Sequence, residues 1–179
     1  KSYLGKKVAV MGLARSGQSA AEALKAGGAE VIAWDDDVKK CRESALLGIN
    51  ISDLTKEDFT NIDALILSPG IPHSYPAPHV VVKKAKKANT PIIGDIEIFV
   101  KNFIEPRIVG ITGTNGKSTT TALVGHILRC AGLPVEIGGN IGLPVLGFEN
   151  TLDAGYQILE LSSYQLELTP SLCCEIAVI

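Results

Sequence analysis

Residues 107–118 read RIVGITGTNGKS, a short apolar run followed by a glycine-rich turn. Residues 107–111 are typical of a buried parallel strand, and a helix is expected from about Ser118 to Ala131. A glycine turn between a strand and a helix exposes backbone N–H groups, and the helix N-terminus adds partial positive charge. Lys117 can reach the outer phosphates of a nucleotide there, and the Ser118 hydroxyl can ligate Mg²⁺. The stretch therefore predicts a site for the phosphates of ATP.

This turn departs from the general pattern G-x-x-x-x-G-K-[ST], because Ile111 occupies the first glycine position. The strand expected at residues 156–161 contains Glu160 near its carboxyl end, where ligands of open α/β sheets gather. A carboxylate at that place can hold Mg²⁺ opposite Ser118. The alternatives are an ordinary glycine turn with a surface lysine, and a strand-end glutamate in solvent.

A second glycine loop lies near the start of the chain. The apolar strand predicted at residues 7–11 is followed by GLARSG at residues 12–17, and Asp35 stands about 20 residues further on. This approximates the dinucleotide pattern G-x-[GA]-x-x-G, in which the middle residue lets the backbone approach a pyrophosphate. Ala14 at that middle position weakens an NAD interpretation but supports binding of some diphosphate. A tight turn without a ligand is the alternative.

The repeated order of strand, glycine loop and helix predicts an α/β fold with parallel sheets. We expect further strands at residues 30–34, 61–67 and 91–93, helices at 18–25 and 80–88, and irregular chain over 135–147. Two domains are predicted, a Rossmann-like domain at 1–95 and a truncated P-loop-type ATP-binding domain at 96–179. Since domains cluster near ~100–150 residues, the short second unit indicates part of a longer chain.

Composition narrows the class of protein. Hydrophobic residues make up 46% of the chain and charged residues 20%, which favours a buried core over disorder. The formal net charge of −2 gives no general attraction to nucleic acid or to an anionic membrane surface. No stretch approaches the ~18 apolar residues that span a bilayer, and no signal-peptide pattern opens the sequence. A cytoplasmic, monomeric protein is expected.

Several sequence blocks together resemble the Mur ligases, which build the peptidoglycan precursor. The glycine loop at 110–119 is similar to the ATP loop of that family and departs from the general pattern in the same way. Three further blocks are similar to the member that adds D-glutamate: GDIE at 94–97, GGNIG at 138–142 and ELSSYQL at 160–166. The resemblance covers the whole chain.

The resemblance implies roles for individual residues. Those expected to bind the UDP part of the substrate are Leu13, Ala14, Arg15, Ser16, Asp35, Asp36, Ser68 and Gly70. Those expected to contact the remainder of the substrate are Asn140 and Ser162. Those expected to bind ATP are Gly113, Thr114, Asn115, Gly116, Lys117, Ser118 and Thr119. Lys117 and Glu160 would be catalytic, and Ser118 with Glu160 would hold Mg²⁺.

The reaction that the resemblance implies is ATP-dependent amide formation between D-glutamate and UDP-N-acetylmuramoyl-L-alanine, through an acyl phosphate. Positioning and charge neutralisation are the main demands of such a phosphoryl transfer. The present chain alone is expected to be inactive. Two other functions stay open from the residues: an NAD-linked oxidoreductase that uses the first glycine loop, and a nucleotide-binding module without turnover.

Overall fold

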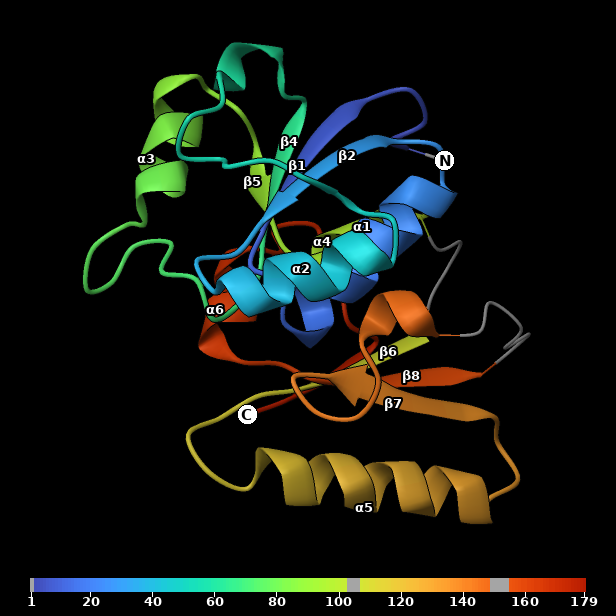
Figure 1. The fold of residues 1–179 in the computed structure, drawn as a ribbon. Helices are drawn as coiled ribbons and strands as arrows, with labels where there is room; N and C mark the ends of the chain where they lie inside the picture. The colour runs from blue at the N-terminus through green and yellow to red at the C-terminus, as the bar shows by residue number, and fades with distance from the viewer. Residues whose placement is uncertain (1, 103–106, 149–154) are drawn as a thin grey trace.

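The computed structural model describes residues 2–102, 107–148 and 155–179, which form two parallel β-sheets with helices around them (Figure 1). The first sheet has the order β3-β2-β1-β4-β5, and the second has the order β7-β8-β6-β9. Every strand pair within the described residues is parallel. The predicted α/β class with a Rossmann-like first sheet is confirmed.

The elements have the following bounds. The first sheet consists of β1 (Lys7–Met11), β2 (Glu30–Trp34), β3 (Asn50–Ile51), β4 (Ala64–Leu67) and β5 (Ile92–Ile93). The second consists of β6 (Arg107–Ile111), β7 (Val135–Gly139), β8 (Tyr156–Glu160) and β9 (Ile176–Val178). The α-helices are α1 (Arg15–Ala26), α2 (Val38–Leu46), α3 (Val80–Lys87), α4 (Asp95–Asn102), α5 (Lys117–Cys130) and α6 (Ser163–Glu167). Two 3₁₀ turns are η1 (Phe59–Asn61) and η2 (Val145–Gly147).

The first sheet is apolar on both faces because helices cover both. Side chains alternate along a strand, so Val8 and Val10 of the central β1 pack in one core with α1. Ala9 and Met11 face the other way and pack in a second core with α3. This two-sided burial explains why β1 reads as a continuous apolar run.

The second sheet is covered by α5 on one face and by α4 on the other. Val109 and Ile111 of β6 pack with the α5 side, whereas Ile108 packs with Phe99 of α4. Ile98, on the same helix, belongs to the core of the first sheet. Helix α4 therefore lies between the two sheets and contributes to both cores (Figure 1).

The structure differs from the sequence prediction at several places. The prediction of irregular chain over 135–147 is wrong, because residues 135–139 form β7, which pairs with β8. Helix α1 begins at Arg15, earlier than predicted, and β4 begins at Ala64 after the η1 turn. The expected domain boundary, between residues 95 and 96, falls at the start of α4. The division into 1–95 and 96–179 stays a prediction.

No helix in the described part of the chain combines the length and the apolar character needed to cross a lipid bilayer.

Candidate functional site

The first glycine loop leaves the N-terminus of α1 open to a ligand. Ala14 occupies the N-cap position and makes no side-chain hydrogen bond to the first turn. The N–H groups of a first helical turn have no acceptor within the helix, so they are available to an anion. The Ser68 hydroxyl, after β4, donates to the Gly12 carbonyl oxygen at 2.8 Å and holds the loop against the neighbouring strand.

Asp35 fixes the same loop from the end of β2. Its carboxylate accepts the Leu13 N–H at 2.6 Å and the Asp37 N–H at 2.9 Å. The Lys40 ammonium lies 3.3 Å from the same carboxylate. Burial alone would raise the pKa of Asp35, but the Leu13 and Asp37 N–H donors and the Lys40 ammonium outweigh it and lower the pKa below its ordinary value. Asp35 is therefore an ionised, buried support for the loop.

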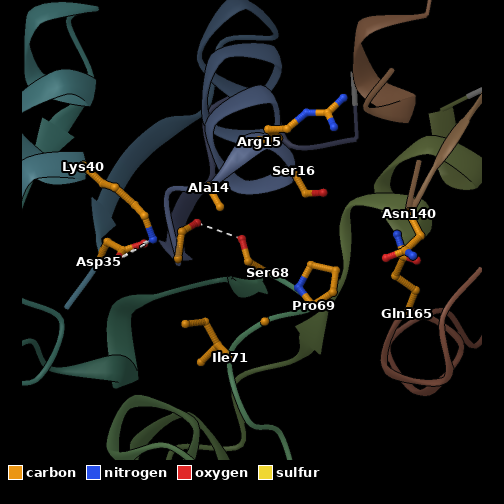
Figure 2. Close-up of a pocket in the computed structure, with 12 residues that line it drawn as sticks. Ala14, Arg15, Ser16, Asp35, Lys40, Ser68, Pro69, Ile71, Asn140 and Gln165 are labelled. Atoms are coloured by element: carbon orange, nitrogen blue, oxygen red, sulfur yellow. Dashed lines mark hydrogen bonds and ion pairs between the residues drawn. The ribbon is translucent and has the colours of Figure 1, made fainter. Parts of the chain in front are cut away.

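A cavity of about 310 Å³ opens beside this loop. Its lining residues are Gly12, Ala14, Arg15, Ser16, Asp35, Lys40, Ser68, Pro69, Gly70, Ile71, Asn140 and Gln165. Figure 2 shows Lys40 and Asp35 at one end and Asn140 and Gln165 at the other. The cavity is thus formed between the end of the first sheet and two segments that follow strands of the second.

Three residues that the sequence predicted for substrate binding are absent from this lining. Leu13 is buried, and its N–H is engaged by Asp35. Asp36 is exposed and lies 3.1 Å from Nε2 of His79. Ser162 caps α6, where its hydroxyl accepts the Gln165 N–H at 3.3 Å. The other predicted substrate-binding residues line the cavity.

The cavity also contains residues that the sequence prediction left out, chiefly Lys40, Ile71 and Gln165. Lys40 lies within the first two turns of α2, a helix that was not predicted. Gln165 takes part in a capping box with Ser162, in which the Gln165 side chain accepts the Ser162 N–H at 3.0 Å. The S-x-x-Q spacing was a visible sequence signal for that helix start.

The second glycine loop has the backbone geometry of a phosphate cradle. Gly113 and Gly116 take φ values of +137° and +78°, which favour glycine. Gly116 is the N-cap of α5 and provides no side chain there. Lys117 Nζ donates to the Gly113 carbonyl oxygen at 2.7 Å and lies 3.4 Å from that of Thr114. The lysine thus folds over its own loop, while Thr114, Asn115 and Thr119 are exposed around it.

Ser118, Glu160 and Asn140 converge at the carboxyl ends of the central strands. The Ser118 hydroxyl donates to Glu160 Oε2 at 2.7 Å, and Asn140 Nδ2 donates to Glu160 Oε1 at 2.8 Å. The parallel register places Glu160 beside Ile111 on β6 and Gly139 on β7. Glu160 is 1% exposed, so these polar contacts offset the cost of burying its side chain.

The chemistry of this cluster fits Mg²⁺. A hydroxyl and a carboxylate are the oxygen ligands that Mg²⁺ prefers, and the ion is commonly completed by phosphate oxygens and water. Within the described residues, no group of three or more His, Cys, Asp or Glu side chains gathers to enclose a metal by itself. The site therefore suits a metal that arrives with a phosphorylated ligand.

Comparisons with known proteins identify relatives of the chain. A profile of the Mur ligase middle domain matches residues 111–179. A UDP-N-acetylmuramoylalanine--D-glutamate ligase of Phenylobacterium zucineum (strain HLK1) is 50% identical over 183 residues, covering 99% of this chain and 39% of that protein. The ligase of the same name from Caulobacter sp. (strain K31) is 49% identical, covering 96% and 38%. The chain thus spans about two fifths of the length of these curated relatives.

A solved structure supports the fold. The UDP-N-acetylmuramate:L-alanyl-gamma-D-glutamyl-meso-diaminopimelate ligase from Neisseria meningitides superposes with a TM-score of 0.52 at 20% identity. The match covers 87% of this chain and 52% of that one. At this identity the likeness shows a shared fold and leaves the substrate open.

Proposed function

Because the chain belongs to the Mur ligase family, we propose that it is the nucleotide-binding part of a ligase that joins D-glutamate to UDP-N-acetylmuramoyl-L-alanine at the expense of ATP. The two relatives reported above, at 49–50% identity, carry that activity in their names. In this proposal residues 1–95 bind the UDP part of the substrate, and residues 96–179 hold ATP and Mg²⁺. The protein would work as a cytoplasmic monomer.

The observation that carries the proposal is the position of Asn140. Its side chain lines the cavity beside the first glycine loop and also donates to Glu160, the carboxylate next to Ser118. A substrate whose diphosphate lies at the N-terminus of α1 and whose far end reaches Asn140 would meet the phosphates of ATP there. That adjacency is what transfer between two bound ligands requires.

Different segments of the chain would bind the substrate diphosphate, the ATP phosphates and Mg²⁺. The first turn of α1 would bind the substrate diphosphate, and Ser68 and Gly70 line the same cavity. The loop at 113–119 would hold the ATP phosphates through backbone N–H groups, and Lys117 would turn from the Gly113 carbonyl toward them. Ser118 and Glu160 would hold Mg²⁺. ATP would supply the phosphoryl group that activates the substrate carboxylate as an acyl phosphate, from which the D-glutamate amine displaces phosphate.

The test is a reconstitution with the full-length protein. Phosphate release from ATP should require both UDP-N-acetylmuramoyl-L-alanine and D-glutamate, and omission of either should abolish amide product. Asn140→Ala should raise the KM for the UDP substrate and lower kcat, because it removes a group between the two sites. Asn50→Ala, on the exposed position of strand β3, is the matched control.

Two results would contradict the proposal. Tight binding of NADH together with no binding of UDP or UDP-N-acetylmuramoyl-L-alanine would return the first loop to an oxidoreductase function. Binding of ATP and of the UDP substrate by the full-length protein without any amide product would indicate a nucleotide-binding module.

A further inference from the structure

The Asp35 carboxylate is engaged by groups of the protein on both of its oxygens. A carboxylate offers about four acceptor positions on its two oxygens. Oδ2 receives the Leu13 N–H at 2.6 Å and Lys40 Nζ at 3.3 Å. Oδ1 receives the Asp37 N–H at 2.9 Å and Lys40 Nζ at 3.5 Å. Two backbone N–H groups and one ammonium shared between the two oxygens thus hold the carboxylate.

Lys40, in contrast to Asp35, can only donate hydrogen bonds. An ammonium carries three donors and no acceptor, and the contacts of Lys40 Nζ all go to one carboxylate. Its side chain is 39% exposed and lines the cavity. The charge of Lys40 is therefore held at the cavity wall beside Asp35 (Figure 2), and one ammonium has more donors than this carboxylate uses.

The other cation of the lining is already engaged. The Arg15 guanidinium donates to the Gly142 carbonyl oxygen, across the gap between the two sheets. Figure 2 shows its side chain directed away from Lys40 and Asp35. Among the described residues that line the cavity, Lys40 is therefore the cation available at the Asp35 end.

The position of Asp35 indicates which part of a nucleotide lies there. In parallel α/β sheets the phosphates sit at the first helix N-terminus, and the residue after the second strand meets the nucleoside. Asp35 directly follows β2, and Gly12 N–H donates to the Trp34 carbonyl oxygen at 2.8 Å, so the two chain segments lie side by side. The Lys40 end of the cavity is thus the nucleoside end.

Resting on the proposed function, we propose that Lys40 is a specificity-determining residue that donates a hydrogen bond to the nucleoside of the UDP substrate, and that Asp35 acts as a positioning residue for Lys40. The acceptor is a hydroxyl of the ribose or a carbonyl oxygen of the uracil. A substitution of Asp35 acts on nucleoside binding through Lys40, whereas its effect through the loop at Leu13 falls on UDP and pyrophosphate alike.

The test compares two probes by calorimetry with the full-length protein. UDP occupies the nucleoside and the phosphate positions, whereas inorganic pyrophosphate occupies the phosphate position alone. Lys40→Met should weaken UDP binding roughly tenfold or more, since hydrogen bonds to charged groups are among the stronger ones. The affinity for pyrophosphate should not change. Lys39→Met is the matched control, because Lys39 is 82% exposed and pairs with Glu43.

Three further variants sharpen the result. Asp35→Asn should lower the ratio of UDP to pyrophosphate affinity in the unsubstituted background and leave it unchanged in a Lys40→Met background, because the two residues act as one unit. Lys40→Gln should rank between lysine and methionine and replaces the methionine variant if that one does not fold. With 2′-deoxy-UDP, loss of the Lys40 effect assigns the acceptor to the 2′-hydroxyl of the ribose, and persistence assigns it to the 3′-hydroxyl or to a carbonyl oxygen of the uracil.

An equal loss of UDP and pyrophosphate affinity in Lys40→Met would overturn the inference, because Lys40 would then be a phosphate contact. Unchanged UDP affinity would overturn it as well. If the unsubstituted protein binds pyrophosphate but not UDP, the proposed function itself is wrong, and the Lys40 variants are not needed to reach that conclusion.

Discussion

Gly17→Ala should disable the first glycine loop while leaving the second intact. Gly17 lies in the first turn of α1 and is buried against the start of its own loop. A Cβ added there would overlap the Gly12 carbonyl oxygen and would lie 2.5 Å from Ser68 Oγ and 2.9 Å from the Gly12 carbonyl carbon. Two of these three atoms belong to the backbone, so a change of rotamer cannot relieve the overlap.

The size of the effect follows from the displacement. Contacts below 3.0 Å are essentially never seen for real Cβ atoms, so the loop or the helix must move by about 1 Å or more. Overpacking of this kind costs about 1–3 kcal/mol of unfolding free energy. A misplacement of about 1 Å in a binding site can lower the rate or the affinity about 100-fold. We therefore expect UDP binding to fall about 100-fold, with moderate loss of stability.

The assay is calorimetric titration of the full-length variant with UDP and, separately, with ATP. ATP affinity should stay within about twofold of the original, because Gly17 lies outside the second loop. Gly147→Ala is the matched control, since a Cβ on Gly147 meets no atom within 4 Å. An unchanged affinity for UDP in folded Gly17→Ala protein would refute the reasoning, as would equal losses for UDP and ATP.

Three further predictions concern other parts of the structure. Asp95 is 3% exposed, and burial raises its pKa above the ordinary 3.8. The protonated side chain therefore stabilises the fold fully below pH 3.8, and this stabilisation is lost as pH rises through the folded-state pKa. Asp95→Asn should therefore gain unfolding free energy relative to the original protein as pH rises from 4 to 8, and a pH-independent difference in urea unfolding would count against this. Phe99 is fully buried and packs edge-to-face with Phe148, with ring centroids 5.7 Å apart. Phe99→Ala should therefore lower the free energy of unfolding by about 3–5 kcal/mol in the same measurement. A loss below about 1 kcal/mol would contradict the packing of α4 in the core of the second sheet. Ser118→Ala removes the hydroxyl that lies 2.7 Å from Glu160 Oε2 and should lower kcat about 100-fold with Mg²⁺, whereas unchanged kcat in steady-state kinetics would exclude Ser118 from the metal site.

The central strands could be predicted because a strand buried on both faces consists of a nearly continuous run of apolar residues. β2 and β6 have the predicted bounds, and both are short apolar runs ended by polar or glycine residues. The glycine loops that follow β1 and β6 could be located for the same reason, since they begin where these runs stop. Position at the carboxyl end of a parallel strand selected Glu160 as a candidate site residue, and a spacing of about 20 residues from the first glycine pattern selected Asp35.

Strand β7 was missed because tertiary packing requires its glycines. Gly138 and Gly139 weaken any strand pattern. In the structure a Cβ on Gly138 would lie 2.6 Å from the Phe148 ring, and one on Gly139 would overlap the Glu160 carbonyl oxygen. Gly139 allows β7 to approach Glu160 of β8, and Gly138 leaves room for Phe148, so both requirements depend on residues further along the chain.

Lys40 and Gln165 could not be selected from local pattern, because each reaches the cavity from a helix whose direction only the fold determines. Lys40 depends on the way α2 leaves β2, and Gln165 on a five-residue helix after β8. The sequence gives no distance between these two helices. Their arrangement follows from the packing of the two sheets.

That packing depends on α4, which couples the two candidate nucleotide sites. Its Glu97 is fully buried and accepts Lys101 Nζ at 2.8 Å, the Ser171 hydroxyl at 2.7 Å and the Ser171 N–H at 3.0 Å. Burial would raise the pKa of Glu97, but the Lys101 and Ser171 donors outweigh it, and the pKa lies below its ordinary 4.5. The stabilisation that the ionised Glu97 side chain provides is therefore fully present above pH 4.5 and is lost as pH falls through its folded-state pKa. Since the same helix places Ile98 in the first core and Phe99 in the second, weakening this anchor would shift the first loop relative to Asn140. In the proposed ligase, the distance between the two bound ligands would therefore depend on α4, which packs in the cores of both sheets.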